Sequence, residues 1–340
     1  MALARIKLCA LLILGIDTSC DETACAVAGD GFRVLSEATR TQDEHKAFGG
    51  VVPELAARAH ARLLPRLVEL SLERAGISWD SLDGVSTTLG PGLPGALMVG
   101  VVFAKAVAQA LKLPFVGVNH LEGHIFSLLL TERIDPPLLA LIASGGHTDL
   151  VYVRAWGEYR VLARTRDDAV GECFDKAARI LGLGYPGGPE IENLAKGGDP
   201  NFHEFPVPRM DEMAFSYSGL KTSFLYYTIR QEPGFVAENL PHICASFQEA
   251  AIRQLVEVCA RGVEMARVRN LAVVGGVSVN SALREMFRRE FGGNVFFPDP
   301  RYSTDNGAMI AGVGLYRLEN GLTSPLDAGV YPNWELGHEV

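Results

Sequence analysis

The sequence lacks long hydrophobic runs, because no stretch reaches the roughly 18 apolar residues that a membrane-spanning helix requires. The run from Leu8 to Leu14, with Arg5 and Lys7 nearby, resembles a short signal peptide. No A-x-A cleavage pattern follows it, and the run continues directly into GIDTSCDETACAV. We therefore expect no membrane association, and a first β-strand preceded by a short N-terminal extension.

Paired cysteines and an excess of positive charge are also missing. The six cysteines show no C-x-x-C spacing, which is typical of reduced thiols in a cytoplasmic protein. The net charge of −9 argues against a protein that wraps nucleic acid by bulk attraction, although it leaves room for a local basic patch. With 340 residues, of which 48% are hydrophobic and 21% charged, the chain is long enough for two globular domains.

Three common site motifs do not occur. Without a Walker A pattern or a G-x-G-x-x-G pattern, P-loop and Rossmann nucleotide sites are disfavoured. The H-E-x-x-H motif of zinc peptidases is replaced by H-L-E-G-H, which puts Glu122 between the histidines. On a helix Glu122 points about 200° away from His120, so it cannot act as the base of such a peptidase.

The most informative feature that is present is the histidine pair His120 and His124. Residues four apart lie on one face of a helix, so both imidazoles can reach one metal ion. The pair follows a predicted buried strand that ends in Asn119, a candidate helix cap, and ligands of open α/β sheets bind at such strand ends. The alternative is a helix face whose histidines hydrogen-bond to their neighbours.

A metal site needs at least a third ligand, and Asp305 in YSTDNGAMIAGVGLY is the best distant candidate. The stretch indicates a polar loop followed by a helix of small residues. Asp305 is also a good residue for a helix cap or first turn, which is the competing interpretation. Two imidazoles and one carboxylate would leave coordination positions open, as a catalytic or substrate-binding site requires.

The order of predicted elements repeats in the two halves of the chain. Residues 11–41 indicate three strands, residues 51–76 a helix, and the following segments strand–GPG–helix and strand. From residue 137 the order restarts with three strands, and VRNLAVVGGVSVNSALREMFRRE later gives strand, Gly-Gly turn and helix. The sequence therefore predicts an α/β protein of two duplicated lobes, residues 1–135 and 136–340, with a ligand cleft between them.

Three glycine-containing turns are candidates for nucleotide binding. Ser144 to Gly146 follow a buried strand, Gly275 and Gly276 precede a helix whose first turn holds Asn280, and residues 185–192 open another helix. Glycine allows backbone N–H groups to approach an anion closely, and a helix N-terminus attracts negative charge. Each could instead be an ordinary tight turn. Asp175, in the predicted helix GECFDKAARILGL, could contact a ribose hydroxyl or lie solvated at the positive helix end.

Nine motifs occur in the order found in one known family. They are GIDTSCDET, GGVVPELAARAH, GPGLPGAL, NHLEGH, ASGGHTDL, GECFDKAARILGL-x-YPGGP, FSYSGLKT, GGVSVN and STDNGAMIA. Over roughly residues 12–318 the chain resembles the tRNA N6-adenosine threonylcarbamoyltransferase family, in its bacterial and organellar branch, once described as sialoglycoprotein endopeptidases. One departure is Asp17, where many members have Glu; the charge is the same.

The resemblance implies a fold of the actin/Hsp70/sugar-kinase type, two lobes around a nucleotide cleft. It implies that His120, His124 and Asp305 bind one metal ion, Fe²⁺ first and Zn²⁺ as the alternative. It also implies a set of residues that hold the substrate, in which Glu192 has an assisting role: Ile142, Ala143, Ser144, Gly145, Gly146, Asp175, Gly188, Glu192 and Asn280. No residue is assigned as a catalytic base.

The activity implied is transfer of the threonylcarbamoyl group from L-threonylcarbamoyl-adenylate to N6 of adenosine 37, in tRNAs that read codons starting with A, with release of AMP. The implied partners are tRNA, a paralogous subunit and a P-loop ATPase subunit. The first rival is a small-molecule kinase or ATPase of the same fold, which would transfer phosphate or hydrolyse ATP without tRNA. A metallopeptidase is the second rival, and a non-catalytic scaffold subunit is the third.

Overall fold

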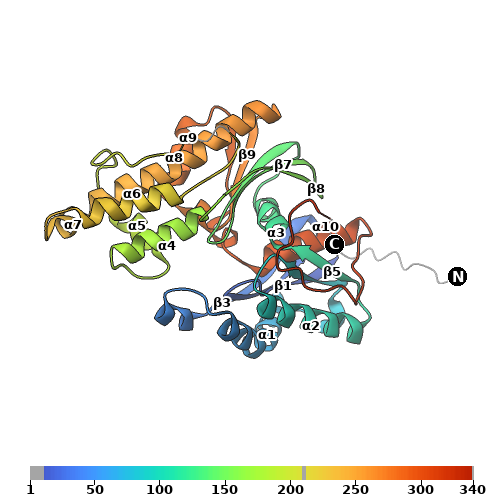
Figure 1. Cartoon of the computed structure of the whole chain (residues 1–340). Coiled ribbons are helices and arrows are strands. Elements are labelled where there is room, and N and C mark those ends of the chain that lie inside the picture. The colour runs from blue at the N-terminus through green and yellow to red at the C-terminus, as the bar shows by residue number, and fades with distance from the viewer. Residues whose placement is uncertain (1–10, 209–211, 339–340) are drawn as a thin grey trace. The chain divides into compact units, whose positions relative to one another are not determined.

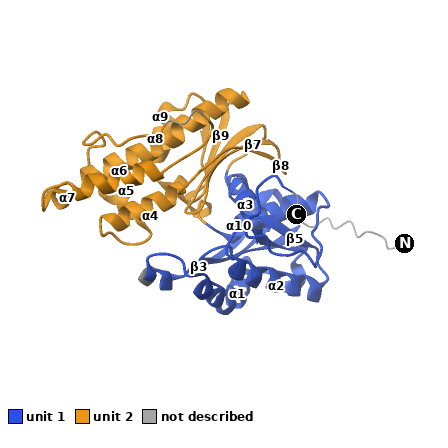
Figure 2. Ribbon diagram, in the orientation of Figure 1, with its two compact units in different colours: residues 1–131, 305–338, 340 blue, residues 132–304, 339 orange. Residues whose placement is uncertain are grey.

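The computed structural model describes residues 11–208 and 212–338, so the predicted N-terminal extension, residues 1–10, lies outside the described part (Figure 1). The chain divides into two compact units (Figure 2). Unit 1 comprises the residues up to Thr131 together with Asp305–His338, and unit 2 comprises Glu132–Thr304. The predicted division at residues 135 and 136 differs from this in two respects: the boundary lies four residues earlier, and the last segment of the chain returns to unit 1.

Unit 1 contains a five-stranded sheet in the order β3-β2-β1-β4-β5. Its strands are β1 (Leu12–Asp17), β2 (Glu22–Gly29), β3 (Arg33–Thr41), β4 (Gly84–Gly90) and β5 (Phe115–Asn119). Its α-helices are α1 (Pro53–Ala75), α2 (Pro94–Leu111), α3 (His120–Phe126) and α10 (Gly307–Glu319). The helix predicted over residues 51–76 is confirmed as α1, and it ends where Gly76 adopts the left-handed conformation at φ 68°.

Unit 2 repeats this sheet. Its strands are β6 (Leu138–Ala143), β7 (Thr148–Ala155), β8 (Glu158–Arg164), β9 (Asn270–Val274) and β10 (Asn294–Phe296), in the order β10-β9-β6-β7-β8. Its α-helices are α4 (Val170–Ile180), α5 (Gly187–Ala195), α6 (Ser218–Ile229), α7 (Phe235–Glu238), α8 (Leu240–Ala266) and α9 (Ser281–Glu290). Short 3₁₀ helices cover Asp30–Phe32, Asp43–Phe48, Trp79–Ser81, Ser127–Leu130, Gly276–Val279 and Pro300–Tyr302.

The two sheets share one topology. In each, three antiparallel strands come first in the chain, and two strands then add in parallel to the free side of the first: β4 and β5 in unit 1, β9 and β10 in unit 2. The duplicated α/β order predicted from the sequence is therefore confirmed. Because β1 and β4 are parallel, as are β6 and β9, their carboxyl ends meet at one edge of each sheet, where ligands of such sheets bind.

The last helix, α10, belongs to unit 1 because it lies directly on the sheet. A Cβ atom at Gly15 of β1 would come within 2.4 Å of the Ala311 nitrogen, and one at Gly314 within 2.5 Å of Ser86 in β4. Glycine at both contacts removes the side chain that would separate the backbones. The return of α10 brings Asp305, just before its start, next to the sheet that carries the histidine helix.

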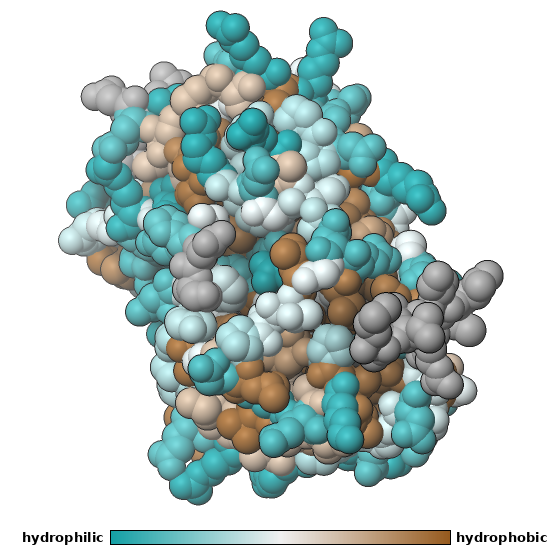
Figure 3. Space-filling view, turned by 90° about the vertical axis from the view of Figure 1, so that its right-hand side faces the viewer, coloured by the Kyte–Doolittle hydropathy of each residue, from teal (hydrophilic) through white to brown (hydrophobic). Residues whose placement is uncertain are grey.

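One helix in the described part of the chain, α2, is long and apolar enough to cross a membrane by length and composition, which is weak evidence on its own. One side of α2 packs against β4 and α1, and its buried residues include Leu97, Val101 and Ala104. On its other side Met98 and Val102 are 49% and 58% exposed. Apolar and polar side chains are also interspersed on the face drawn in Figure 3. Helix α2 thus covers the sheet with one side and leaves the other side exposed.

Candidate metal centre and glycine-rich turns

Helix α3 begins where β5 ends, as the sequence predicts. The Asn119 side chain accepts hydrogen bonds from the N–H groups of Leu121 and Glu122, so it caps the helix. Gly123 allows close packing against α10, because a Cβ there would lie 2.9 Å from the Ile310 side chain. All seven residues of α3 are buried, which fixes both histidines in the interior of unit 1.

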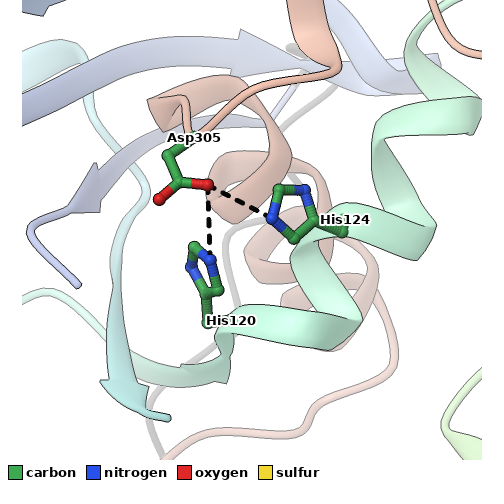
Figure 4. A group of neighbouring side chains, drawn as sticks. All are labelled: His120, His124 and Asp305. Atoms are coloured by element: carbon green, nitrogen blue, oxygen red, sulfur yellow. Dashed lines mark ion pairs between the residues drawn. The ribbon is translucent and has the colours of Figure 1, made fainter. Parts of the chain in front are cut away.

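The two imidazoles and the Asp305 carboxylate point toward one another (Figure 4). Asp305 Oδ1 lies 3.4 Å from His120 Nε2 and 3.2 Å from His124 Nε2, and one ligand atom from each residue lies within 4.8 Å of the others. Two ligand atoms that are each about 2.1 Å from a tetrahedral ion lie about 3.4 Å apart. The three residues therefore have the spacing of one face of a metal site, and Asp305 is not the helix cap, since Asn306 caps α10.

The environment of these side chains also fits a cation. Both nitrogens of His124 and Nδ1 of His120 are buried without a hydrogen-bond partner, a costly arrangement that metal ligation of one nitrogen relieves. The Asp305 side chain is 20% exposed, whereas those of His120 and His124 are 9% and 0% exposed. Solvent therefore reaches the three side chains from the side of the carboxylate. The alternative, in which the histidines pair with protein neighbours instead of an ion, would rest on the carboxylates of Asp305 and Asp17, which lie 3.2–3.4 Å from the ring nitrogens.

Charge interactions shift the pKa values of the same groups. Burial lowers the pKa of His120, but the carboxylates of Asp305 and Asp17 outweigh burial and raise it well above its ordinary value. Burial likewise raises the pKa of Asp305, and the two imidazoles outweigh it and lower that pKa. A proton and a metal ion therefore compete for the same cluster of negative charge.

Asp17, at the carboxyl end of β1, supports His120 from the other side. Its Oδ2 lies 3.4 Å from His120 Nδ1, and its Oδ1 accepts hydrogen bonds from Thr88 Oγ1 at 2.7 Å and the Ser19 N–H at 3.2 Å. A carboxylate on the second nitrogen of a ligating histidine fixes the orientation of the ring. Asp17 was not among the predicted site residues, and its place at the end of a predicted strand was the available signal.

Glu122 forms a buried ion pair with Arg317 of α10. It is 1% exposed, and its Oε2 accepts a hydrogen bond of 2.6 Å from Arg317 Nη2 on α10. A carboxylate that is buried and bound by an arginine is not available to serve as the base of a metallopeptidase. The expectation from helical geometry that Glu122 points away from the His120 side is consistent with this contact.

In unit 2 the glycine turns after β6 and β9 lie against each other. A Cβ at Gly275, where φ is +90°, would lie 2.5 Å from the Ala143 carbonyl oxygen. The N–H of Gly171 donates to the Ser144 carbonyl at 3.2 Å, which brings the start of α4 to the same place. Gly145 and Gly146 are exposed, and a Cβ at either position would meet nothing within 4 Å, so the turn is open on that side. Ile142 and Ala143 are wholly buried, so their side chains belong to the core.

The other predicted substrate residues form two linked pairs. Asp175 Oδ1 accepts a hydrogen bond of 2.7 Å from the Gly187 N–H, and the N–H groups of Gly187 and Gly188 oppose the rise in the pKa of Asp175 that burial causes. Glu192 Oε1 accepts from the N–H and hydroxyl of Ser281, the residue after Asn280. The structure therefore joins Asp175 to the turn that contains Gly188, and Glu192 to the segment that contains Asn280.

Asn280 makes two further contacts. Its side-chain oxygen caps α9 by accepting from the Leu283 N–H, and its amide nitrogen donates to Gln248 of α8 at 2.8 Å. Gln248 was not among the predicted residues; it lies 32 positions before Asn280, and no local pattern connects the two.

A cavity of about 410 Å³ lies in the C-terminal tail, lined by Val330–Glu335 and His338, and contains none of the predicted ligands.

These features define a class of protein: a duplicated α/β fold of the actin/Hsp70/sugar-kinase type with a candidate His-His-Asp metal site. Solved structures support the fold. The chain matches component A of (R)-2-hydroxyglutaryl-CoA dehydratase from Acidaminococcus fermentans with a TM-score of 0.57 and 13% identity, covering 91% of this chain and 98% of that one. It matches HypF from T. kodakarensis with a TM-score of 0.64 and 18% identity, covering 92% of this chain and 48% of that one.

The sequence comparisons are more specific. The family model described as TsaD, tRNA N6-adenosine threonylcarbamoyltransferase, matches residues 33–312. A protein of that name from Salinibacter ruber is 48% identical, covering 96% of this chain and the whole of that protein, and one from Caldicellulosiruptor bescii is 43% identical, covering 95% and 97%. The chain belongs to the tRNA N6-adenosine threonylcarbamoyltransferase family, and it is a transferase.

Proposed function

We propose that His120, His124 and Asp305 hold one divalent metal ion, Fe²⁺ first and Zn²⁺ as the alternative. The observation that carries the proposal is the approach of both imidazole Nε2 atoms to one carboxylate oxygen, at 3.4 and 3.2 Å. Imidazole suits both ions, and two histidines with one carboxylate on one side form the facial set typical of Fe²⁺ sites with open positions. When bound, the ion would orient the threonylcarbamoyl group and stabilise charge on its oxygens.

We propose L-threonylcarbamoyl-adenylate as the donor and N6 of adenosine 37 as the acceptor, in tRNAs that read codons starting with A. The amine attacks the carbamoyl carbon, the bond from that carbon to the phosphate oxygen breaks, and AMP leaves. The exposed turn at Gly145 and Gly146 suits the adenylate phosphate, and the half-buried Asp175 carboxylate suits a ribose hydroxyl. Ile142, Ala143, Ser144, Gly188, Glu192 and Asn280 complete the proposed substrate set.

The residues of this chain act mainly by positioning. The exocyclic amine of adenine is a weak nucleophile, and the carbamoyl carbon is already activated as a mixed anhydride, so holding both in line supplies much of the rate. Gln248 and the α9 cap fix the Asn280 amide, and Asp175 fixes the turn that contains Gly188. We assign no side chain as general base.

The proposal includes partners and a location. The net charge of −9 supports a need for other subunits to hold tRNA, and we propose a paralogous subunit and a P-loop ATPase subunit for this role. We propose a cytoplasmic location. The cysteines among the described residues are free, and four of the five are buried, which suits a reducing compartment.

The test is a reconstitution with the purified chain, its partners, threonylcarbamoyl-adenylate and unmodified tRNA, followed by mass spectrometry of the nucleosides. His124→Ala should lose bound metal and slow modification by about 100-fold or more, because a ligand to the ion is removed. His338→Ala, at an exposed histidine in unit 1, is the matched control and should behave as the wild type. Modification by His124→Ala at the normal rate would contradict the metal role. Phosphoryl transfer from ATP without tRNA would favour the small-molecule kinase instead.

A further inference from the structure

The chain continues after α10 as an irregular segment, residues 322–338, which we call the C-terminal strap (dark red in Figure 1). It first runs beside β5. The Ser324 N–H donates to the Phe115 carbonyl at 2.8 Å, and Ser324 Oγ accepts from the Gly117 N–H at 2.9 Å. Further along, the Ala328 carbonyl accepts from Lys105 of α2. The strap is therefore fastened at successive points, to β5 at Ser324 and to α2 at Ala328.

At the carboxyl end of β4 the strap passes over the Gly-Pro-Gly turn. The Tyr331 N–H donates to the Leu89 carbonyl at 2.7 Å, and the Gly92 N–H donates to the Pro332 carbonyl at 3.1 Å. A Cβ at Gly90 would lie only 1.8 Å from the Tyr331 carbonyl oxygen, so no other residue fits under the strap at this position. The strap and the turn are built to lie against each other.

The strap then reaches Asn119, the residue that caps α3, the helix that carries His120 and His124. The amide nitrogen of Asn119 donates to the Trp334 carbonyl at 3.3 Å, while its amide oxygen accepts from the N–H groups of Leu121 at 2.9 Å and Glu122 at 3.4 Å. An amide can satisfy both sides in one orientation only, oxygen toward the helix and nitrogen toward the strap. The Trp334 carbonyl thus selects the capping orientation of Asn119.

We propose that the C-terminal strap is a positioning element for the metal centre, and that the Trp334 carbonyl, through Asn119, holds the first turn of α3 so that His120 meets Asp305. The strap lies beyond residues 33–312, the segment that the family model matches. The inference rests on the proposed metal site. Partners outside the ligand set that orient a ligand typically change metal affinity by 10- to 100-fold.

A purely structural role for the strap is the competing explanation. Val330, Tyr331 and Trp334 pack against the hydrophobic core formed by β1, β4, α1 and α2, so the strap also buries apolar surface. That role predicts lower stability of the whole unit without a specific effect on metal binding. The two explanations separate in a double-mutant cycle on metal affinity, measured at a temperature at which every variant is folded.

The experiment measures the Zn²⁺ dissociation constant of the full chain by competition with a chelator, with folding checked by circular dichroism. Asn119→Ser keeps a side chain that caps helices and removes the donor to Trp334. A stop after Asn333 removes the carbonyl. Each change alone should weaken Zn²⁺ binding about 3- to 10-fold, which is less than for a group that contacts a ligand directly, because Asn119 and Trp334 act on His120 through the first turn of α3. The double variant should bind Zn²⁺ no more weakly than the more affected single variant, because both changes remove the same hydrogen bond between Asn119 and Trp334.

Trp334→Ala keeps the carbonyl and removes the ring, so it serves as the matched control: stability should fall while Zn²⁺ affinity stays within about twofold of wild type. Additive effects of Asn119→Ser and truncation, unchanged affinity in both, or a loss in Trp334→Ala as large as in the truncation would each overturn the inference. If the truncated chain does not fold, Asn119→Ser and Trp334→Ala in the full chain decide the question. A wild-type chain that binds no Zn²⁺ or Fe²⁺ would overturn the metal site itself.

Discussion

Glu122 carries a charge into the interior of unit 1, and Arg317 is the cation that lies against it. The Arg317 side chain is 24% exposed and that of Glu122 only 2%. Arg317→Met should destabilise the fold by about 3 kcal/mol, because removing one member of a buried ion pair leaves the other charge without its counter-ion. Urea unfolding followed by circular dichroism measures this. The double variant Glu122→Gln/Arg317→Met should recover much of the loss; equal stability of the single and double variants would contradict the explanation.

Glu37 of β3 should make the stability of unit 1 depend on pH. Its carboxylate accepts hydrogen bonds from the N–H groups of Gly307 at 3.1 Å and Ala308 at 3.0 Å, the first residues of α10. Burial raises the pKa of Glu37 from 4.5 to about 7, and the nearby Asp17 charge acts in the same direction, although Thr39 and the two N–H groups lower it. Between these two values the folded chain binds more protons than the unfolded chain.

The contribution of Glu37 to stability is therefore fully present below pH 4.5 and is lost as the pH rises through about 7. Glu37→Gln cannot titrate, so the free energy of unfolding of the wild type minus that of Glu37→Gln should fall between pH 5 and pH 7.5. Urea unfolding at several pH values measures the difference, and subtraction removes the titration of other groups. A difference that stays constant or increases with pH would show that the Glu37 carboxyl is not titrating in this range.

At the residue scale, the sequence predicts those features that depend only on residues close together in the chain. The helical spacing of His120 and His124 and the cap at Asn119 are short-range features, and the structure shows both. Asp17 beside His120 and Gln248 beside Asn280 are contacts between distant segments, which no spacing rule contains. The start of α6 depends on such a contact as well, because Asp167, about fifty positions earlier in the sequence, accepts hydrogen bonds from the Tyr217 and Ser218 N–H groups.

At the scale of elements, the position of α10 depends on close backbone contacts. A Cβ at Gly307 would lie 2.5 Å from backbone atoms of Cys25 and Ala26 in β2. Gly307→Ala should therefore lift the start of α10, weaken Zn²⁺ binding through Asp305 two residues earlier, and lower stability by about 1–3 kcal/mol. Gly292→Ala, where a Cβ meets nothing within 4 Å, is the control. Normal metal affinity and stability in Gly307→Ala would show that α10 can shift without cost.

The elements themselves were well predicted, since strand and helix periodicity, turn glycines and the repeated order all lie in the sequence. The assignment of α10 to a lobe was not, because periodicity shows that a helix is amphipathic or apolar without showing which sheet it covers. The small-residue run GAMIAGVG was the available signal: such a surface permits backbone contact, here with β1, β2 and β4.

At the scale of the whole molecule, unit 1 is built from two separate segments of the chain and unit 2 from one. Unit 2 is a single segment, residues 132–304, with its own sheet and core, so this fragment should fold alone with a cooperative thermal transition. Residues 1–131 alone should not, because the faces of β1 and β4 that α10 covers would be exposed to water. Joining residues 305–340 to them through a flexible linker should restore folding and one metal site. Circular dichroism melting and Zn²⁺ titration of the three fragments test this.

The discontinuity of unit 1 also sets an order of events during synthesis. Both imidazoles leave the ribosome early, whereas the aspartate that joins them comes more than 180 positions later, after the whole of unit 2 has been made. A nascent or prematurely terminated polypeptide thus has the two histidines of the proposed metal site without its carboxylate, and two ligands alone hold a metal ion weakly. If the three residues hold an ion as proposed, loading can only follow near-complete translation, because the full ligand set exists only then.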